Sequence, residues 1–446
     1  MTSDAPGPAR GIRGGPPTLD DRTRRRHLVR AVVAATVGTT VEWYDFFLYN
    51  AAAALVFPRL FFPSSDPYVA TLLSFSTLFA GFAARPVGAV LFGHFGDRIG
   101  RKALLVTTMM VMGVATMAIG LVPSYESIGI WGAVLLTVLR SLQGIAVGGE
   151  WSGSVLMAGE WASPGRRGFT TSFAQMGAPL GLILANGALS VMTVVQDDAT
   201  FLSWGWRVPF LASVVLVAIG LYIRIGVLES PVFVRLKSEG KVVRAPVVHV
   251  LRENWREVML TTLLRTGQLV PYYVFTTYIL SYGTQVLGMS RTTLLTCVSL
   301  RSFTSIVMIP VAGHLSDVYG RKRVVGTGLV GVAIWGFVYF GLLDTTAIPL
   351  IMLAMIVDSV VQDLQYAPQA ALIAENFPAS RRYSGSGLGY HLAAITAGGP
   401  APLIATYLYA RFETPFAIAA FVLASTVISL ATFPWLKDRA GSLDHA

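Results

Sequence analysis

Charged residues are scarce in this chain of 446 residues. They account for 13% of the sequence, while hydrophobic residues account for 54%. A soluble globular domain carries about 25% charged residues, so this composition excludes an ordinary soluble protein. The net charge of +10 comes from basic residues in short segments between apolar runs. That distribution indicates a membrane protein with basic loops on one side, and it argues against a nucleic-acid-binding surface.

An intrachain disulfide is excluded because Cys297 is the only cysteine. The sequence has no glycine-rich phosphate loop of the Walker type, which argues against a process driven by ATP. No hydrolytic or metal-binding constellation stands out, so we expect no cofactor, no metal and no enzymatic activity. The N-terminal segment lacks the short apolar region of a signal peptide, and we expect residues 1–27 to form a disordered cytoplasmic tail.

Apolar runs recur along the rest of the chain, and about 20 apolar residues suffice to cross a bilayer. The runs lie at 28–57, 68–93, 103–122, 128–157, 168–195, 207–226, 257–287, 292–314, 323–343, 347–374, 383–410 and 413–435. They predict an all-α membrane protein with twelve transmembrane helices. The expected organisation is an N-terminal six-helix bundle at 28–226, a cytoplasmic linker at 227–256, a C-terminal six-helix bundle at 257–436 and a short cytoplasmic tail at 437–446.

Lysine and arginine cluster before the first apolar run and after the second, fourth, eighth, tenth and twelfth runs. The opposite loops are poor in basic residues and carry Asp66, Glu126, Asp197, Asp198 and Asp344. Basic loops stay in the cytoplasm, so this pattern predicts a multi-pass protein of the cytoplasmic membrane with both termini inside.

A ten-residue segment occurs twice, at 93–102 and 313–322. The two sequences, GHFGDRIGRK and GHLSDVYGRK, are identical at six of ten positions. Glu160 followed by two arginines likewise recurs as Glu375 followed by two arginines, in the same order along the chain. These repeats predict two homologous halves, which is an architecture of secondary transporters.

The first span contains two carboxylates, Glu42 and Asp45, at a depth where a charge is costly. Glu42, Asp45 and Tyr49 are spaced by three and four residues, so their side chains share one helix face. One interpretation is that the acids are buried partners of basic residues and fix helix packing. The interpretation we favour is a proton- or substrate-handling site, because ionisable groups inside a membrane usually serve a function.

The repeated loop resembles the signature loop of the major facilitator superfamily, because 93–102 follows the pattern Gly-x3-Asp-Arg-x-Gly-Arg-Lys. Within that superfamily the chain is similar to the metabolite:proton symporter family, and its sequence motifs most resemble those of the shikimate-permease-like branch. The segments that carry this similarity are EWYDF at 42–46, RSLQG at 140–144, GGEW at 148–151, WGWR at 204–207 and RYSG at 382–385. The resemblance implies the two-bundle fold of that superfamily.

The resemblance also implies a cytoplasmic gate, in which ion pairs hold the inside closed while the transporter faces outward. We assign to it Asp97, Arg98, Arg101, Glu160 and Arg167 in the N-terminal half, and Asp317, Arg321, Glu375 and Arg382 in the C-terminal half. The alternative is that these charges only set the topology, although the positive-inside rule alone requires neither an aspartate nor the glycines.

The family fold places spans one and four beside a central cavity. At 1.5 Å per residue, Asp45 lies about 25 Å along span one and Arg140 about 18 Å along span four, so both fall near the midplane. The expected substrate-binding residues are Arg140, Tyr49, Gln143, Gln175, Arg265, Gln268, Tyr272, Arg301, Asp358 and Gln362. The proton-coupling candidates are Asp45, Glu42 and His391, and His391 could equally be a hydrogen-bonded structural group.

An arginine at the midplane needs a carboxylate, either from the protein or from the substrate. We therefore expect Asp45 to pair with Arg140 while the cavity is empty. An anionic substrate would take Arg140, after which Asp45 would accept a proton and the two would cross together. Glu42, one turn away, is the alternative proton carrier.

These features predict a secondary transporter that takes up a small organic anion with protons, such as a shikimate-like or other monocarboxylic acid, by alternating access. Its partners would be this substrate, the proton and the lipid bilayer, and we expect a monomer that binds no nucleic acid. Two alternatives fit the same fold: a drug/proton antiporter, and an importer of osmolytes such as betaine or proline. A sensor without transport is disfavoured, because no signalling domain accompanies the spans.

Overall fold

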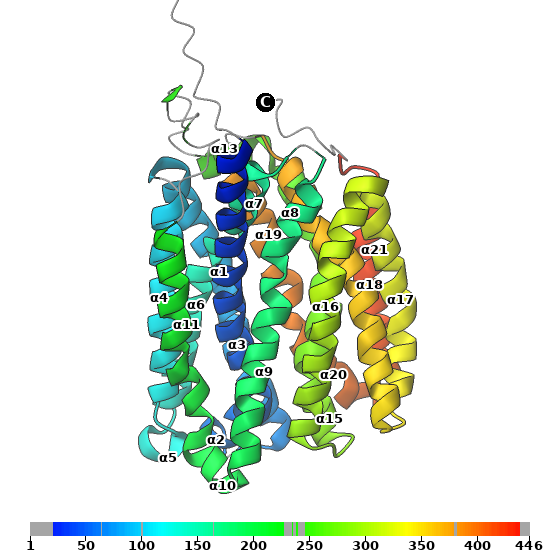
Figure 1. Cartoon of the computed structure of the whole chain (residues 1–446). Coiled ribbons are helices and arrows are strands. Elements are labelled where there is room, and N and C mark those ends of the chain that lie inside the picture. Colours follow the sequence, from blue (N-terminus) through cyan, green and yellow to red (C-terminus); the bar gives the residue numbers. More distant parts are fainter. Residues whose placement is uncertain are drawn as a thin grey trace, which may run out of the picture.

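The structure is a computed structural model that describes residues 21–63, 65–99, 101–163, 165–226, 234, 238–239, 246–378 and 381–437. Every regular element within these ranges is a helix, and the long helices run side by side through the molecule (Figure 1). The all-α class predicted from the sequence is therefore confirmed. We call the end where α13 (Pro246–Glu253) lies the α13 end, and the end where α10 (Asp198–Thr200) lies the α10 end.

The described part of the N-terminal half contains six spans. They are α1 (Asp21–Leu55), α3 (Pro67–Ile99), α4 (Arg101–Leu121), α6 (Trp131–Gly148) continued by α7 (Glu150–Trp161), α8 (Arg167–Gln175) continued by α9 (Gly177–Val195), and α11 (Arg207–Ile225). Short helices connect them at the α10 end: α2 (Phe57–Phe61), α5 (Tyr125–Ile128), α10 and the π-helix η1 (Phe201–Gly205).

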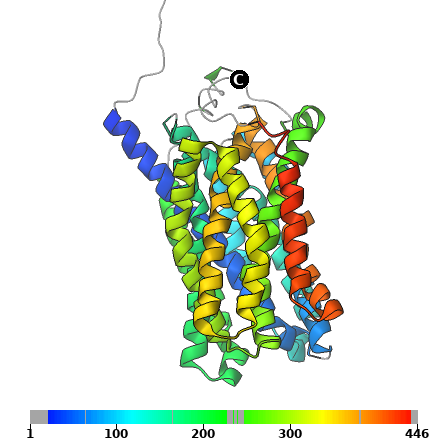
Figure 2. The ribbon, with the colours of Figure 1, turned by 90° about the vertical axis from the view of Figure 1, so that its right-hand side faces the viewer.

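The described part of the C-terminal half contains six further spans, and helices of this half face the viewer in Figure 2. The six spans are α14 (Trp255–Tyr273) with η2 (Val274–Tyr278) and α15 (Ile279–Gln285), α16 (Arg291–Tyr319), α17 (Arg321–Leu343), α18 (Ile348–Glu375), α19 (Arg382–Ala393) with η4 (Ala394–Gly398) and α20 (Pro400–Phe412), and α21 (Phe416–Ala431). The two halves meet where α16 packs along α8 and α9, and where α19 packs along α3.

Eight helical segments in the described ranges are individually long and apolar enough to cross a membrane. Each of the other four spans departs from that simple pattern. Charged residues interrupt α1, two spans are divided by the π-helices η2 and η4, and α21 has only 16 residues. The twelve predicted spans are all present, and the structure explains why a count of uninterrupted apolar helices finds fewer.

The two interrupted spans change geometry close to residues that disturb a regular helix. Pro271 lies inside α14, three residues before η2 begins at Val274. A proline removes a backbone hydrogen bond, and the π-helical turn that follows accommodates the disturbed hydrogen-bond ladder. The π-helix η4 ends at Gly398 and is followed directly by Gly399 and by Pro400, the first residue of α20.

Glycines set the close approach of α3 to α6. A Cβ atom on Gly88 would overlap the backbone of Ile145, and one on Gly148 would overlap the backbone carbonyl of Arg85. A Cβ on Gly144 would meet the carbonyl of Gly81 in the same way. Only glycine leaves room for backbones at this distance, which is the packing role of small residues in membrane helices.

The first span begins earlier than the sequence indicates. Its apolar run starts at residue 28, whereas α1 starts at Asp21, and Figure 2 shows these first turns leaning away from the neighbouring helices. The helix begins and α21 ends at the α13 end, as an even number of spans requires. Residues 1–20 and most of the expected linker at 227–256 lie outside the described residues.

The last part of that linker is the helix α13, which is attached to the start of the span containing α19. The carboxylate of Glu253 accepts hydrogen bonds from Arg381 and His249, and these bonds hold the pKa of Glu253 below its ordinary value. A lowered carboxylate pKa means that this contact is stabilising above the ordinary glutamate pKa and weakens as the pH falls through the lowered value.

Candidate functional site

The carboxylates of the first span face a cluster of buried arginines in the N-terminal half. Glu42 and Asp45 on α1, Arg85 on α3, and Arg140 with Gln143 on α6 line one small cavity. The side chain of Arg140 fits there because residue 81 is a glycine, and a Cβ atom at that position would overlap it. The cavity measures about 10 Å³, enough for at most about one water molecule. The site is therefore closed around its own polar groups.

Arg140 is held by neutral groups. Its Nη1 donates to Oε1 of Gln143 at 3.0 Å and its Nη2 donates to Oδ1 of Asn50 at 3.1 Å. The guanidinium lies over the rings of Phe46 and Tyr49, 4.4 and 4.3 Å from their centroids, and its Nε has no hydrogen-bond partner among the described residues. This corrects the expectation of an Asp45–Arg140 pair, because the aromatic rings and two amides surround the guanidinium instead.

Asp45 is buried without a donor. Neither of its carboxylate oxygens has a hydrogen-bond partner among the described residues. Thr116 is close, but its hydroxyl donates to the carbonyl of Met112 at 3.0 Å and accepts from Gln143 at 2.7 Å. A buried charge without a partner is costly, so this geometry suits a neutral carboxyl group.

A buried ion pair, Glu150 on α7 with Arg224 on α11, lies toward the α13 end. Arg224 also donates to the carbonyl of Leu105 at 2.6 Å, and its guanidinium occupies the space that a side chain on Gly38 would need. The sequence did not assign Arg224 to the site, because it stands at the end of an apolar span beside the basic linker. The signal that could have identified Arg224 was Glu150, a carboxylate within a span that had no assigned partner.

In the C-terminal half, Arg301 and Asp358 bind one another instead of awaiting a ligand. Arg301 Nη2 lies 2.7 Å from Asp358 Oδ2, and its Nε donates to the same oxygen at 2.8 Å. Two other candidates, Gln362 and Gln268, contact one another: the side chain of Gln362 donates to the backbone carbonyl of Gln268 at 2.8 Å. Asp363 is a further buried acid on α18 that the sequence analysis did not assign.

Arg265 has the same kind of surroundings as Arg140. Its Nη1 donates to Gln369 at 3.3 Å, its guanidinium lies 3.8 Å from the ring centroid of Tyr390, and its Nε has no described partner. The neighbouring His391 is fully buried, and neither of its ring nitrogens has a described partner. The structure therefore does not show the hydrogen bonds that a structural histidine would make.

Aromatic side chains fill the space between the two arginine clusters. Trp43, Phe46, Phe47 and Phe82 from the N-terminal half pack against Tyr272 and Tyr273 from the C-terminal half. Trp151 stacks on Tyr390 at 3.7 Å between ring centroids. Its indole donates to Gln175, which donates in turn to the carbonyl of Tyr366 at 3.3 Å. Tyr49 donates to Thr77 at 2.7 Å.

The halves are also joined at the α13 end by the C-terminal copy of the repeated loop. Asp317 accepts hydrogen bonds from the backbone N–H groups of Gly168 and Phe169, at 2.9 and 2.8 Å, at the start of α8. Arg321 lies 2.6 Å from Asp317 and 3.2 Å from Glu375. A carboxylate at a helix N-terminus is stabilised by unpaired N–H groups and by the helix dipole.

The structure describes the side chains of only some of the other candidate gate residues. Arg382 donates through Nε to the carbonyls of Ala374 and Phe377, at 3.0 and 3.2 Å, so it caps the end of α18. Arg167 is buried and Glu160 is half-buried at the same end. The side chains of Asp97, Arg98 and Arg101 lie outside the described residues.

The α10 end holds a wider opening. A cavity of about 440 Å³ lies between the halves there, and Arg59, Thr71, Gln285 and Arg291 are among the residues that line it. The halves are connected across it by Arg291 and Asp198, 3.1 Å apart, and by Gln285, which donates to Thr71 at 3.1 Å. The molecule is thus sealed tightly at the α13 end and less tightly at the α10 end.

Comparisons with known proteins agree with this architecture. Residues 31–246 match the family model described as sugar (and other) transporter, and residues 272–444 match that of the major facilitator superfamily. The shikimate transporter of Escherichia coli (strain K12) is 39% identical over 413 residues, which cover 92% of this chain and 94% of the relative. The inner membrane metabolite transport protein YhjE of the same organism is 38% identical over 388 residues, covering 86% and 88%.

Among solved structures, the chain is similar to the xylose transporter XylE from E. coli in a partially occluded inward open conformation. The TM-score is 0.74 at 19% identity, with 94% of this chain and 99% of that chain covered. At that identity the similarity shows the fold alone.

Proposed function

The chain belongs to the major facilitator superfamily, within its metabolite transporters, and on that premise we propose that it imports a small monocarboxylic acid together with a proton. The observation that carries this proposal is Arg140, a buried cation that shares its cavity with acids but donates its hydrogen bonds to two neutral amides. A planar guanidinium with an unused Nε–H can bind a carboxylate through two parallel hydrogen bonds. Asp45, in the same cavity, supplies a carboxyl group that can carry the proton.

The balance of buried charge supports an anion that travels with a proton. Between the two ends, the buried arginines and carboxylic acids of the described residues number five each: Arg85, Arg140, Arg224, Arg265, Arg301, Glu42, Asp45, Glu150, Asp358 and Asp363. A substrate carboxylate adds one negative charge to this set. A net charge is costly in the membrane interior, so a proton taken up with the anion restores the balance.

The corrected geometry changes the coupling scheme in one respect. Asp45 and Arg140 are apart in this closed structure, which is the arrangement expected when Asp45 carries a proton. The empty carrier must close without that proton, and in this state Asp45 pairs with Arg140 to compensate both charges. In the loaded carrier the substrate carboxylate binds Arg140 and the proton neutralises Asp45, so together they replace this internal pair. With only one of them bound, one charge is left uncompensated and the carrier closes poorly.

The direction of access follows from the topology. The basic loops support a cytoplasmic location for the α13 end. The cavity at the α10 end is then the outer vestibule, and the Asp317–Arg321–Glu375 network is the cytoplasmic gate. The substrate enters past Arg59 and Arg291, which line the vestibule. It reaches Arg140 when the aromatic cluster between the halves separates.

A counterflow screen in proteoliposomes tests the substrate class. Shikimate-like acids, keto acids and aromatic monocarboxylates are offered to purified protein, with amides of the same acids as matched neutral controls. We expect exchange of at least one acid and no exchange of its amide. In a separate assay of net uptake, we expect the same acid to make the external medium more alkaline. Exchange of amides and acids alike, or uptake without proton movement, contradicts the proposal. Proton-driven ejection of a lipophilic cation would instead identify an exporter.

A betaine is the second candidate, and the aromatic cluster favours it. A betaine has the carboxylate that Arg140 would bind, and its quaternary ammonium group suits the faces of rings such as Trp43 and Phe47. Glycine betaine and a matched monocarboxylate without the ammonium group therefore belong in the same screen. Preference for the betaine would assign the transporter to osmolyte uptake.

A further inference from the structure

Buried polar groups continue from the coupling site toward the α13 end, inside the N-terminal half. Glu42 lies one turn from Asp45 on α1, and α1 packs against α7, the helix that carries Glu150. Glu150 stands about 16 Å from the α13 end of α7, and Ser154 about 10 Å from it, at 1.5 Å per residue. These groups lie at successive depths along one side of the half.

Glu150 uses only one of its two carboxylate oxygens. Its Oε1 binds Arg224, whereas its buried Oε2 has no hydrogen-bond partner among the described residues. Thr108 is close to Glu150, but its hydroxyl donates to the carbonyl of Leu105 at 3.2 Å. Ser154 follows four residues later on the same face of α7, and its buried hydroxyl has no described partner either. Two orphaned polar groups on neighbouring turns are unusual in a membrane interior, because each costs free energy unless a third group or a water molecule serves it.

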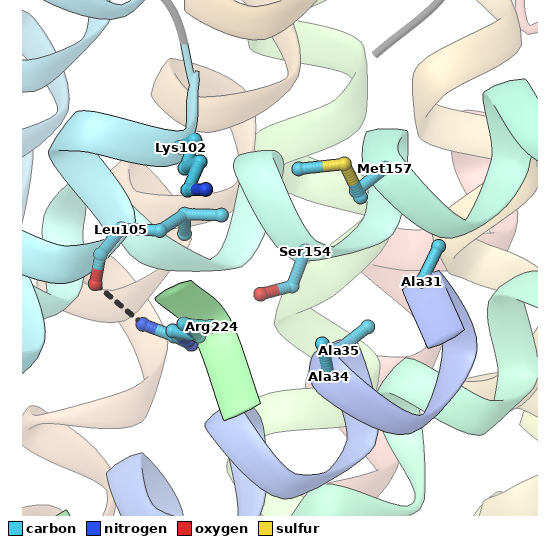
Figure 3. A pocket seen from close by; sticks show the side chains of 8 residues that line it. All are labelled: Ala31, Ala34, Ala35, Lys102, Leu105, Ser154, Met157 and Arg224. Atoms are coloured by element: carbon cyan, nitrogen blue, oxygen red, sulfur yellow. Dashed lines mark hydrogen bonds between the residues drawn. The ribbon is translucent and has the colours of Figure 1, made fainter. Parts of the chain in front are cut away.

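A cavity lined by Ser154 and by Arg224, the ion-pair partner of Glu150, has room for that water. It measures about 20 Å³, above the 10–15 Å³ or so that one water needs. Its lining includes Ser154, Arg224, Leu105, Lys102 and Ala35. Figure 3 shows the Ser154 hydroxyl pointing into the space enclosed by these side chains, with the Arg224–Leu105 hydrogen bond at one edge. Lys102, which donates to the carbonyl of Ile225, marks the border toward the α13 end.

We propose that Glu150 and a water molecule in this cavity carry the transported proton from the coupling site to the cytoplasm. The proposal deepens the proposed function and rests on it. The proton leaves the carboxyl group of Asp45, directly or by way of Glu42, and binds Oε2 of Glu150 while Oε1 stays on Arg224. Glu150 then gives the proton to the water beside Ser154, and it leaves past Lys102. One proton enters the route and one leaves it.

Arg224 makes Glu150 suitable for this role. The guanidinium interacts with two carboxyl groups, Glu150 by direct contact and Glu42 at longer range. Arg85 is a second cation near Glu42, so a proton that passes from Glu42 to Glu150 moves within one set of coupled acids and arginines and leaves the net charge of that set unchanged. A purely structural ion pair would need neither the second acid nor the adjacent cavity.

The first test compares net uptake with exchange in proteoliposomes carrying Glu150→Gln. Exchange needs no proton release, so we expect counterflow to stay within about twofold of the unmodified protein. The initial rate of proton-driven uptake should fall roughly a hundredfold, the lower range for loss of a positioned acid–base group. The final accumulation ratio should be unchanged, because the coupling residue Asp45 is intact and only the speed of proton release changes.

The second test alters the cavity and leaves Glu150 in place. Ser154→Val fills the cavity and should slow net uptake at unchanged counterflow, whereas Ser154→Ala leaves room for water and should slow it less. Met157→Leu lines the same cavity and conserves volume, so it serves as the matched control. This series decides the matter if Glu150→Gln does not fold.

The outcomes separate the relay from the function on which it rests. If uptake by the unmodified protein moves no protons, the proposed function fails. If that uptake is coupled but net uptake and counterflow fall equally in Glu150→Gln and in Ser154→Val, the pair and its cavity are structural. Unchanged net uptake in both variants also rejects the relay.

Discussion

Arg140 has a full set of neutral neighbours, and their arrangement makes its planar shape matter as much as its charge. Asn50 and Gln143 fix the two ends of the guanidinium, and two aromatic rings hold its faces. We expect Arg140→Lys to weaken substrate binding by about 1.5–3 kcal/mol, because an ammonium group cannot reproduce the lost charge-assisted hydrogen bond. Equilibrium binding of the transported acid measures this.

Arg207→Lys is the matched control for Arg140→Lys. Arg207 donates to the carbonyls of Gly120 and Val122 at the α10 end, away from the cavity. It should leave binding unchanged. Equal affinity in Arg140→Lys and the unmodified protein would mean that the substrate does not bind at Arg140.

The isolation of Asp45 leads to a sharper prediction than its charge alone. Asp45→Asn mimics the protonated carboxyl group, and no described donor loses a partner. The variant should keep substrate binding and exchange but lose accumulation against a gradient, because it can no longer release a proton. Radiolabelled uptake with and without an imposed pH gradient measures both. Accumulation with normal proton stoichiometry would move the coupling role to Glu42 or His391.

Residue identity in the site was more predictable than residue pairing. The costly acids and arginines of the spans could be selected from the sequence, since few charges occur in apolar runs. Their partners could not, because Arg140 turned out to bind Asn50 and Gln143, and Asp45 turned out to bind nothing described. Side-chain pairing depends on how helices rotate and tilt against one another, and glycines such as Gly38 and Gly81 decide it by leaving space.

At the scale of helices, the positions of the spans could be predicted from the apolar runs. The breaks inside the spans could not. The run at 257–287 was expected as one helix, but it contains the π-helix η2 after Pro271. The run at 383–410 contains η4, which ends two residues before Pro400. A π-helical turn inserts one residue into a helix, so tertiary packing rather than local sequence selects its place.

The helix α8 provides an element-scale prediction, because Asp317 caps its first turn from the opposite half. Asp317→Asn removes the charge from two backbone hydrogen bonds and from the contact with Arg321. We expect the α13 end to open more often, and transport to fall more than equilibrium binding. Accessibility of single cysteines at that end measures the opening.

Asp344→Asn is the control for Asp317→Asn. Asp344 also lies at a helix end, but it accepts a hydrogen bond from Tyr282 within the C-terminal half. It should change stability without changing accessibility at the α13 end. If both variants behave alike, the contact of Asp317 with α8 is not a gate. Asp97→Asn tests the corresponding role of the N-terminal copy of the loop, which stays a prediction.

For the whole molecule, the charge pattern predicts which end faces the cytoplasm. Ser238 is exposed in the expected linker, so a cysteine placed there should react with an impermeant reagent only in inverted vesicles. A cysteine in place of Thr345, which is exposed between α17 and α18, should react only from outside intact cells. Labelling of Ser238→Cys from outside would invert the scheme and with it the direction of the proposed proton route.

The two ends of the molecule should oppose one another, and this can be tested with one pair of variants. Arg291–Asp198 holds the α10 end, and Asp317 holds the α13 end. Asp198→Ala should raise the labelling of a cysteine at Thr284, which lines the cavity at the α10 end. Asp317→Asn should lower that labelling, since the carrier then spends more time open to the other side. The contacts are far apart and should contribute independently, so the double variant should label near the level of the unmodified protein. Labelling in the double variant as high as in Asp198→Ala alone would show that the ends do not alternate.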